Sequence, residues 1–123
     1  MYPEDFKYTK DHEWVEVAGA EGRIGITDYA QKQLGDIVYL DLPEPGKVVK
    51  QGQVLGTVES VKAVSEIFAP VSGEVVHVNK ALADKPEQVN SAPHESWMVT
   101  LKLSDPSEIN KLLDATQYTE LAK

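Results

Sequence analysis

The sequence predicts a mainly β fold, a flattened sandwich of short strands with short helices and a helical C-terminal tail. Short runs of β-branched and other apolar residues recur along the chain, and turns that contain Pro or Gly separate them. One strand–turn–strand pattern occurs twice, and the strongest helix signals lie in the last segment. The 123 residues suffice for one domain with its own core. We therefore expect a single domain over residues 1–123, with a core at about 8–103 and a helical tail at about 105–121.

Strand and helix signals alternate in the first part of the chain. Polar and apolar residues alternate over Glu13–Val17, which is typical of a half-buried strand, and Arg23–Ile26 predicts a second strand. Thr27 or Asp28 can then cap a short helix that ends at Gly35. The remaining strands are expected at Ile37–Leu42, Val48–Val49, Val54–Val58, Ile67–Pro70, Glu74–Val78 and Trp97–Leu103.

Two later segments differ from this pattern. Asn79–Ser96 contains two prolines and little periodicity, which predicts a long loop with one helical turn near Ala81–Ala83. Asp105 is followed by Pro and then by Glu108, which can reach back to the cap, so a helix is expected from this point. Tyr118 is expected in a second short helix.

The repeated pattern frames the middle of the chain. Pro43–Val49 and Pro70–Val76 each read Pro, two residues, Gly, a charged residue, Val and Val, at an offset of 27 residues. Chance can produce such a match, because these residue types are common in β proteins. The other explanation is a duplicated strand–turn–strand unit whose copies pack into the sandwich. Lys62, between the copies, would then lie on a tight turn at one edge.

Charge and composition exclude several classes of function. Asp plus Glu number 20 against 12 Lys plus Arg, and this net charge of −8 disfavours a protein that binds the nucleic-acid backbone. The absence of Cys excludes a thiol nucleophile, a disulfide and a Cys-based zinc site. The three His residues lack the spacing of a ligand set, so no metal is expected. No apolar run approaches the roughly 18 residues of a membrane helix, and residues 1–11 resemble neither a signal peptide nor a transit peptide.

Lys62 is the side chain best suited to a functional role. A lone lysine is normally a solvated surface charge. Lys62, however, lies between Val61 and Ala63, with acidic and hydroxyl residues on both sides. An exposed turn with rigid flanks can offer an ε-amine to a modifying enzyme, and an amine on a long stem suits amide formation with an acyl group.

The pentapeptide Glu59–Ala63 resembles the lipoyl-attachment motif of the glycine cleavage system H protein family. Further segments extend this resemblance over essentially the whole chain: Tyr8–Lys10, His12–Val15, Gly25–Ala30, Leu34–Val38, Leu42–Glu44 with Gly46, Ala69–Val75, and Val89–Asn90 with Pro93. The loop before Trp97 departs from the family's aromatic and Gly-containing pattern and is one residue short at His94–Ser96.

The resemblance implies a lipoyl-domain-like β sandwich, a barrel-sandwich hybrid, that acts as a non-catalytic carrier. Lipoate would be attached covalently to Lys62, and the flanks of the attachment turn would be Glu59, Ser60, Val61 and Ala63. The carrier would take an aminomethyl group from glycine decarboxylase to aminomethyltransferase and pass electrons to dihydrolipoyl dehydrogenase. Lipoate-attaching enzymes would modify it first. A monomer is expected, in a bacterial cytoplasm or, for a eukaryotic chain, in the mitochondrial matrix.

Glu13 allows two interpretations. From the sequence alone it lies on the polar face of a strand. By resemblance it is the acid that holds the amine of the loaded aminomethyl group, and Asp11 and Glu66 help to line the same cleft. Ion pairing in a site that excludes water would slow hydrolysis of that group.

Other carriers with a modified lysine fit less well. Biotin carriers flank the lysine with Met, whereas Met1 and Met98 lie far from Lys62. A lipoyl domain of a 2-oxoacid dehydrogenase is shorter and lacks the His12–Trp14 opening and the capped tail helix. Two other roles stay open: a relay that passes lipoyl groups to other lipoyl domains, and an interaction protein that is never modified.

Overall fold

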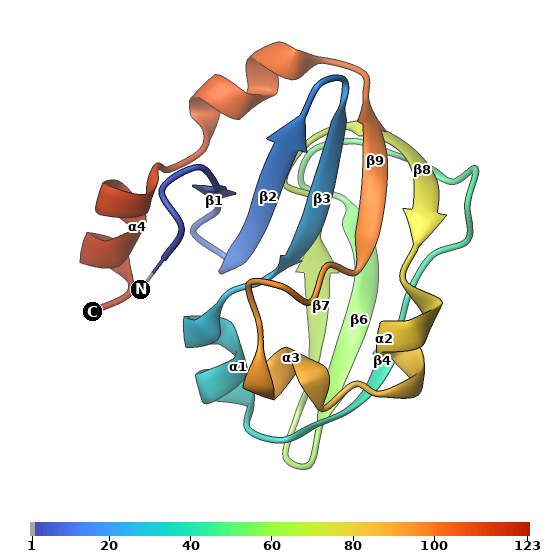
Figure 1. Cartoon of the computed structure of the whole chain (residues 1–123), viewed down its shortest axis with the longest axis vertical. Coiled ribbons are helices and arrows are strands. Elements are labelled where there is room, and N and C mark those ends of the chain that lie inside the picture. Colours follow the sequence, from blue (N-terminus) through green and yellow to red (C-terminus); the bar gives the residue numbers. More distant parts are fainter. Residues whose placement is uncertain (1) are drawn as a thin grey trace.

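A computed structural model describes residues 2–123 and shows a mainly β molecule built from two sheets (Figure 1). One sheet has six strands in the order β1-β2-β3-β9-β8-β5, and the other has three strands in the order β4-β6-β7. All neighbouring strands are antiparallel. The predicted mainly β sandwich with short helices is confirmed.

The elements are short, and turns or brief loops connect them. The strands are β1 Lys7–Tyr8, β2 Glu13–Ala18, β3 Glu21–Ile26, β4 Ile37–Asp41, β5 Val48–Val49, β6 Val54–Ser60, β7 Val64–Phe68, β8 Gly73–Val78 and β9 Val99–Leu103. The helices are α1 Asp28–Leu34, α2 Lys80–Asp84, α3 Gln88–Ser91 and α4 Ala115–Leu121, with a 3₁₀ helix, η1, at Pro106–Lys111. Within the described residues no helix has the length and apolar character that a membrane span requires.

Helix α1 follows the sequence signals closely. The Thr27 side chain accepts a hydrogen bond from the Ala30 amide at 3.2 Å, which makes Thr27 the N-cap. Gly35 ends the helix with a φ of 79°, a conformation that favours glycine. The helix therefore enters β4 at a fixed position, close to the end of the β6–β7 hairpin.

The helical turn expected near Ala81–Ala83 is present as α2, and the rest of Asn79–Ser96 is more ordered than the expected loop. The segment holds two helices, because the Asn79 side chain caps α2 and Leu82 and Val89 are buried at 1% and 0% exposure. The strand expected at Ile67–Pro70 instead runs over Val64–Phe68, since its pairing with β6 continues to the hairpin turn. The short strand β1 was not predicted from the sequence.

The two copies of the repeated pattern pair with each other. Val48 of β5 lies opposite Glu74 of β8, and the Gly46 amide donates to the Val75 carbonyl at 2.7 Å. The copies therefore join edge to edge in the six-stranded sheet, and do not face each other across the sandwich. The chain between them forms the β6–β7 hairpin of the second sheet, which places Lys62 at its end.

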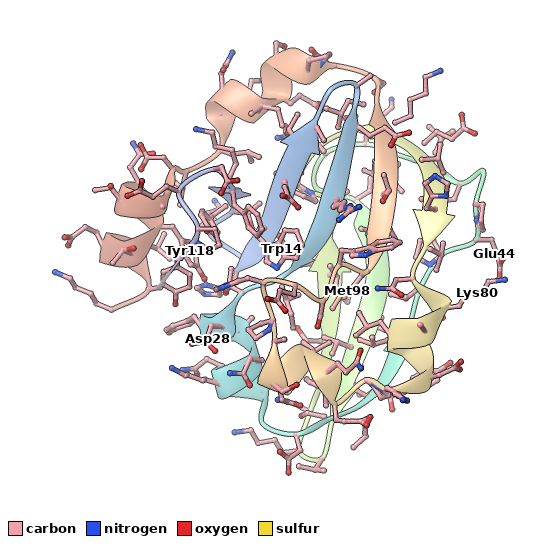
Figure 2. All side chains as sticks on the ribbon, viewed as in Figure 1. Trp14, Asp28, Glu44, Lys80, Met98 and Tyr118 are labelled. Carbon is pink, nitrogen blue, oxygen red and sulfur yellow. The ribbon has the colours of Figure 1, made fainter. Side chains whose placement is uncertain are left out.

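Three clusters form the hydrophobic core. The first lies between the sheets and contains Val15, Ile24, Val49, Leu55, Ala69, Val71, Val75, Val99 and Leu101. The second is built on the three-stranded sheet and the short helices, from Ile26, Ile37, Leu40, Val58, Ile67, Leu82, Val89 and Met98. The third joins the N-terminal residues to α4, through Phe6, Tyr8, Trp14, Ala115 and Tyr118 (Figure 2). Each buried aliphatic or aromatic side chain contributes roughly 1.5–3 kcal/mol to folding.

The C-terminal tail is helical but differs in detail from the prediction. Asp105 caps a 3₁₀ helix, not an α-helix, and Glu108 does not reach back to that cap. The Glu108 carboxylate instead accepts hydrogen bonds from the Ser72 amide at 2.7 Å and the Ser72 hydroxyl at 2.8 Å. These charge-assisted bonds hold the tail against the turn before β8. The tail then continues into α4, which begins with a capping box between Asp114 and Gln117.

Candidate functional site

The β6–β7 hairpin ends in a short turn that projects beyond the rest of the three-stranded sheet (Figure 1). The last regular pair of residues is Glu59 and Val64, and the Ser60 amide donates to the Ala63 carbonyl at 2.8 Å. Val61, Lys62 and Ala63 are all exposed, and Val61 has 70% of its surface in solvent. The turn thus presents Lys62 outward from a regular strand pair.

The Ser60 hydroxyl holds the turn from inside. It accepts the Lys62 amide at 3.3 Å and the Ala63 amide at 3.1 Å, and Ser60 itself is only 9% exposed. The Val61 amide donates to the Asp36 carbonyl at 3.0 Å, which ties the turn to the connection between α1 and β4. Because hydroxyls of this kind replace backbone acceptors in turns, the backbone beside Lys62 is ordered while its side chain is not covered.

The Lys62 side chain is free to react. Among residues 2–123 its ammonium forms no salt bridge. Its stem passes close to Gly35, where an added Cβ would lie 3.5 Å from Lys62 Cε. An aliphatic stem against the backbone with a solvated amine is the usual arrangement for an exposed lysine.

The sheet face beside the turn is both apolar and acidic. Tyr39, Glu59 and Val64 form one row across β4, β6 and β7, and Tyr39 and Val64 are 52% and 66% exposed. The next row contains Asp41 and Glu66 on either side of Thr57. Directly opposite residues share one face of a sheet, so carboxylates and exposed apolar groups adjoin the Lys62 turn.

Glu13 lies elsewhere and is buried, with 2% of its surface exposed. Its carboxylate accepts hydrogen bonds from the Thr9 hydroxyl at 2.6 Å and from the Phe68 amide at 3.1 Å. Phe68 ends β7, six residues beyond Lys62, which corresponds to about 20 Å of extended strand. The structure therefore excludes the interpretation of Glu13 as a solvated strand residue, and it does not bring Glu13 to the hairpin turn.

The surroundings of Glu13 change its protonation. Burial raises the pKa of the Glu13 carboxyl to about 7, although the hydrogen bonds from Thr9 and Phe68 act in the opposite direction. A carboxyl with this pKa exchanges its proton near neutral pH.

A cavity of about 450 Å³ opens beside Glu13. Its walls come from the N-terminal turn, the end of β7 and the C-terminal tail, and its lining residues are Tyr8, Thr9, Lys10, Asp11, Glu13, Gln51, Gly52, Phe68, Ala69, Pro70, Lys111, Leu112, Leu113 and Leu121. Asp11, which was expected to help line a cleft with Glu13, lines the same cavity. Glu66 is not part of this lining.

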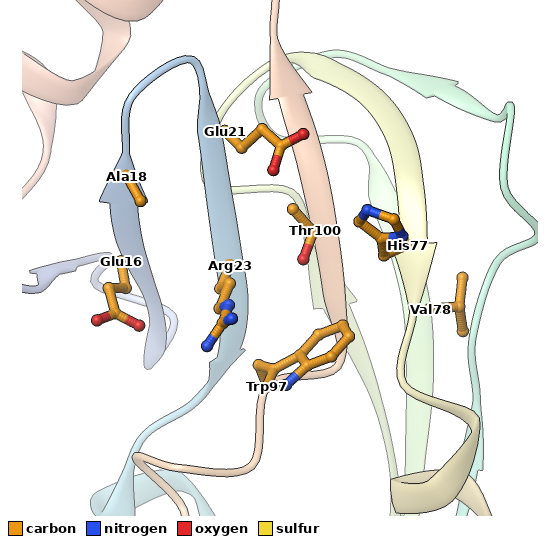
Figure 3. Close-up of a pocket in the computed structure, with 8 residues that line it drawn as sticks. All are labelled: Glu16, Ala18, Glu21, Arg23, His77, Val78, Trp97 and Thr100. Atoms are coloured by element: carbon orange, nitrogen blue, oxygen red, sulfur yellow. The ribbon is translucent and has the colours of Figure 1, made fainter.

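A second cavity, of about 620 Å³, lies on the outer face of the six-stranded sheet (Figure 3). Glu16, Arg23, Thr100 and His77 form a row there across β2, β3, β9 and β8. The Arg23 guanidinium lies over the Trp97 ring, 5.6 Å from its centroid. None of the residues predicted to hold or protect an acyl group lines this cavity.

Comparison with known proteins identifies the family of the chain. A family model described as "Glycine cleavage H-protein" matches residues 6–123. The chain belongs to this family.

Individual relatives are similar over nearly their whole length. The glycine cleavage system H protein of Koribacter versatilis is 56% identical over 121 residues, covering 98% of this chain and 94% of the relative. That of Geobacillus kaustophilus is 56% identical over 117 residues, covering 94% and 92%. The crystal structure of a glycine cleavage system H protein from Mycobacterium marinum superposes with a TM-score of 0.88 at 39% identity, and 97% of each chain is covered. Membership of the H-protein family assigns the chain to the glycine cleavage system.

The loop at His94–Ser96, which was expected to depart from the H-protein pattern, is held by several hydrogen bonds. The Asp28 amide donates to His94 Nε2 at 3.2 Å, and the Ser96 hydroxyl donates to the Ala92 carbonyl at 2.7 Å. The Trp14 indole donates to the Pro93 carbonyl at 3.2 Å. This loop therefore packs against α1 and the third core cluster.

Sequence reasoning missed two residues that shape the surroundings of Glu13. Thr9 supplies a hydrogen bond to its carboxylate, and Tyr118 contacts the neighbouring His12 from α4. Thr9 sits four residues before Glu13, a spacing that suits a side-chain bond to the backbone. No local signal points to Tyr118, which is 106 residues from His12.

Proposed function

We propose that this chain is the lipoyl-bearing carrier of the glycine cleavage system, with lipoate joined to Lys62 through an amide. The observation that supports this most strongly is the hairpin turn itself. It holds the backbone around Lys62 with the buried Ser60 hydroxyl and leaves the amine in solvent. A modifying enzyme can bind such a turn without first ordering it, which lowers the entropic cost of recognition.

The residues of the turn fit an acyl group on Lys62. The amine has no ion-pair partner among residues 2–123 that attachment would have to break. Ser60 fixes the turn, and Val61 and Ala63 leave the approach open on both sides. Glu59 stands in the first row of the adjoining sheet face. When bound, lipoate supplies a disulfide ring that accepts the aminomethyl group and two electrons.

The sheet face beside the turn supports a carrier that meets several enzymes. Its exposed Tyr39 and Val64 offer apolar contact, and its carboxylates offer charge for orientation. The partners in this proposal are glycine decarboxylase, aminomethyltransferase, dihydrolipoyl dehydrogenase and the lipoate-attaching enzymes. The chain itself supplies attachment, presentation and protection, and the chemistry belongs to the cofactor and the partners.

Glu13 is the residue proposed to protect the amine of the loaded group. Its carboxylate borders a cavity that Phe68 and Leu112 help to line, and the 2% exposure of Glu13 limits its contact with water. An ammonium beside the carboxylate would favour the ionised form of Glu13 and lower its raised pKa. Pairing and water exclusion together would slow loss of the aminomethyl group.

Intact mass tests the central claim. Wild type, Lys62→Arg and Lys50→Arg would each be co-expressed with a lipoate ligase and lipoate. We expect one added lipoyl mass in wild type and in Lys50→Arg, which keeps every residue of the turn, and none in Lys62→Arg. An unshifted wild-type mass would favour an interaction protein that is never modified. Glycine–bicarbonate exchange with glycine decarboxylase then separates a carrier from a relay, because only a carrier of the aminomethyl group supports the exchange.

A further inference from the structure

The hydroxyl of Tyr118 joins three segments that are distant in the chain. Its oxygen lies 2.7 Å from His12 Nδ1 and 2.7 Å from Thr27 Oγ1. The Tyr118 ring is fully buried and stacks on Tyr8, with 4.7 Å between ring centroids. The hydroxyl is therefore a fixed polar group between α4, the turn before β2 and the N-cap of α1.

The Thr27 hydroxyl determines which group donates and which accepts in each hydrogen bond of this network. Thr27 Oγ1 already accepts the Ala30 amide, so its proton is available for the Tyr118 oxygen. Tyr118 then donates its own proton to His12 Nδ1. This arrangement requires a neutral His12 with its proton on Nε2, and burial lowers the pKa of His12, which favours that form.

His12 has an unusual backbone conformation. Its φ is 72°, and within residues 2–123 no other residue except glycine has a positive φ. A side chain in this region costs about 1–2 kcal/mol, so contacts elsewhere must hold it there. Contacts on both its backbone and its ring do so. The His12 carbonyl accepts the Thr27 amide at 3.0 Å, and the His12 ring contacts the Tyr118 hydroxyl and the Tyr29 ring, whose centroid is 4.4 Å away.

The His12 backbone is part of the turn that holds the Glu13 carboxylate. The His12 amide donates to the Thr9 carbonyl at 3.2 Å, closing the turn. The Thr9 hydroxyl accepts the Asp11 and Glu13 amides and donates to the Glu13 carboxylate. A change in the conformation of His12 therefore moves both the carboxylate and its hydrogen-bond donor.

From these contacts we propose that Tyr118 is a positioning residue for the Glu13 carboxylate and acts through His12. The C-terminal helix thereby sets the geometry of a group more than a hundred residues away in sequence. The functional meaning of this coupling rests on the proposed protective role of Glu13. The coupling itself is a property of the unmodified chain, so it can be measured without lipoate.

The test is a titration of the Glu13 carboxyl carbon by NMR in unmodified wild type, Tyr118→Phe and Tyr2→Phe. Tyr118→Phe keeps the ring and removes only the hydroxyl. We expect the midpoint to fall by about half a unit or more from about 7, because a looser turn admits water and burial is the main cause of the raised pKa. Tyr2→Phe is the matched control. Its ring packs edge-on against Tyr118 at 4.9 Å, and we expect the wild-type midpoint.

The Tyr118→Phe substitution made in a His12→Gly protein tests whether Tyr118 acts through His12. Glycine tolerates a positive φ without strain, so His12→Gly keeps the turn but removes the ring that Tyr118 holds. In this background Tyr118→Phe should produce no further shift, as a double-mutant cycle requires for coupled residues. A wild-type midpoint in Tyr118→Phe, an equal shift in Tyr2→Phe, or a shift that persists in His12→Gly would overturn the proposal.

Failure of the proposed function would look different. In the loaded protein, Tyr118→Phe should shorten the lifetime of the aminomethyl group and leave lipoylation of Lys62 complete. If Glu13→Ala does not change that lifetime, the protective role of Glu13 is wrong, whereas the Tyr118 coupling stands on the titration alone.

Discussion

In two turns of this molecule a side-chain hydroxyl accepts hydrogen bonds from two backbone amides, but the two turns differ in their exposure. In the hairpin turn the Ser60 hydroxyl accepts the amides of Lys62 and Ala63. In the turn before β2 the Thr9 hydroxyl accepts the amides of Asp11 and Glu13. The first turn presents an amine to solvent, and the second buries a carboxylate at 2% exposure.

The difference comes from segments that are distant in sequence. Several distant segments cover the N-terminal turn. The contacts come from the Phe68 amide, the η1–α4 connection through Leu113, the α4 side chain of Tyr118, and Thr27 and Tyr29 at the start of α1. The hairpin turn has fewer such ties among residues 2–123: the Asp36 carbonyl accepts the Val61 amide from one side, and the Lys62 stem passes close to Gly35. A side-chain hydroxyl therefore sets the local conformation of each turn. Contacts from segments distant in sequence decide whether the functional side chain of that turn is exposed or buried.

The largest effect is expected from Glu13→Gln, which removes the buried charge. Because the Glu13 pKa is raised to about 7, the folded protein binds more protons than the unfolded chain between pH 4.5 and 7. The free energy of unfolding therefore falls as pH rises through this window. We expect Glu13→Gln to be about 2 to 3 kcal/mol more stable than wild type at pH 8 and equal to it near pH 4.

Urea denaturation at the two pH values measures this difference, and Glu66→Gln, an exposed acid on the other sheet, serves as the control. A gain of the same size at both pH values would show that ionisation is not its cause. In the loaded protein the same substitution should shorten the lifetime of the aminomethyl group. Ionisable Glu13 would then lower the stability of the fold while it protects the aminomethyl group, an opposition that is common at functional sites.

Thr9→Val is expected to be the next largest change. It removes the donor to the buried Glu13 carboxylate and the acceptor of the Glu13 amide, whereas the Asp11 amide, which Thr9 also accepts, is exposed and can bond to water. Buried groups left without partners cost about 1–3 kcal/mol, so we expect a loss of about 2 kcal/mol in thermal or urea unfolding. Thr9→Ser, which keeps the hydroxyl, should recover most of it. Equal losses in Val and Ser variants would instead assign the effect to the methyl group.

Much of the fold could be predicted because its signals are local. The strand at Glu13–Val17, the Thr27 cap and the Gly35 stop were all visible in the sequence and are confirmed, although the burial of β2 does not alternate as its pattern predicts. The strand β1 was missed because its two residues carry no periodicity of their own, and their partners are β2 and, at Tyr8, the distant Leu113. The helical turn expected near Ala81–Ala83 is present as α2, whereas α3 was missed because a single buried residue, Val89, and not a repeating face, anchors it.

The two parts of the candidate site differ in the same way. The hairpin position of Lys62 follows from the repeat around it, so sequence reasoning could locate it. The burial of Glu13 could not be derived from its own strand, because the covering groups belong to Phe68 and to α4. Resemblance to the H-protein family singled out Glu13, and only tertiary structure explains its raised pKa.

Ser60→Ala should cost less than Thr9→Val, although the two hydroxyls make similar bonds. The amides freed at Lys62 and Ala63 are in an exposed turn and can bond to water. We expect a loss of about 1 kcal/mol or less in the free energy of unfolding, together with slower lipoylation in a timed ligase assay. Ser60→Thr should retain wild-type rates. A stability loss as large as that of Thr9→Val would mean that the hairpin turn is not independent of tertiary cover.

The smallest change in stability is expected from Val61→Thr and Val64→Thr. These valines are 70% and 66% exposed, so replacing a methyl with a hydroxyl should alter the free energy of unfolding by less than about 0.5 kcal/mol. Thr also keeps the β-branched shape that suits a strand or turn.

If partners bind this surface, the effect of the two substitutions should instead appear in the KM of the ligase. Loss of about 1 kcal/mol of apolar contact corresponds to a rise in KM of roughly fivefold. Val48→Thr, at 69% exposure on β5, is the control and should leave KM unchanged. An equal rise in KM for all three variants would show that the exposed valines at Lys62 have no special part in recognition, and that the turn's backbone alone presents the amine.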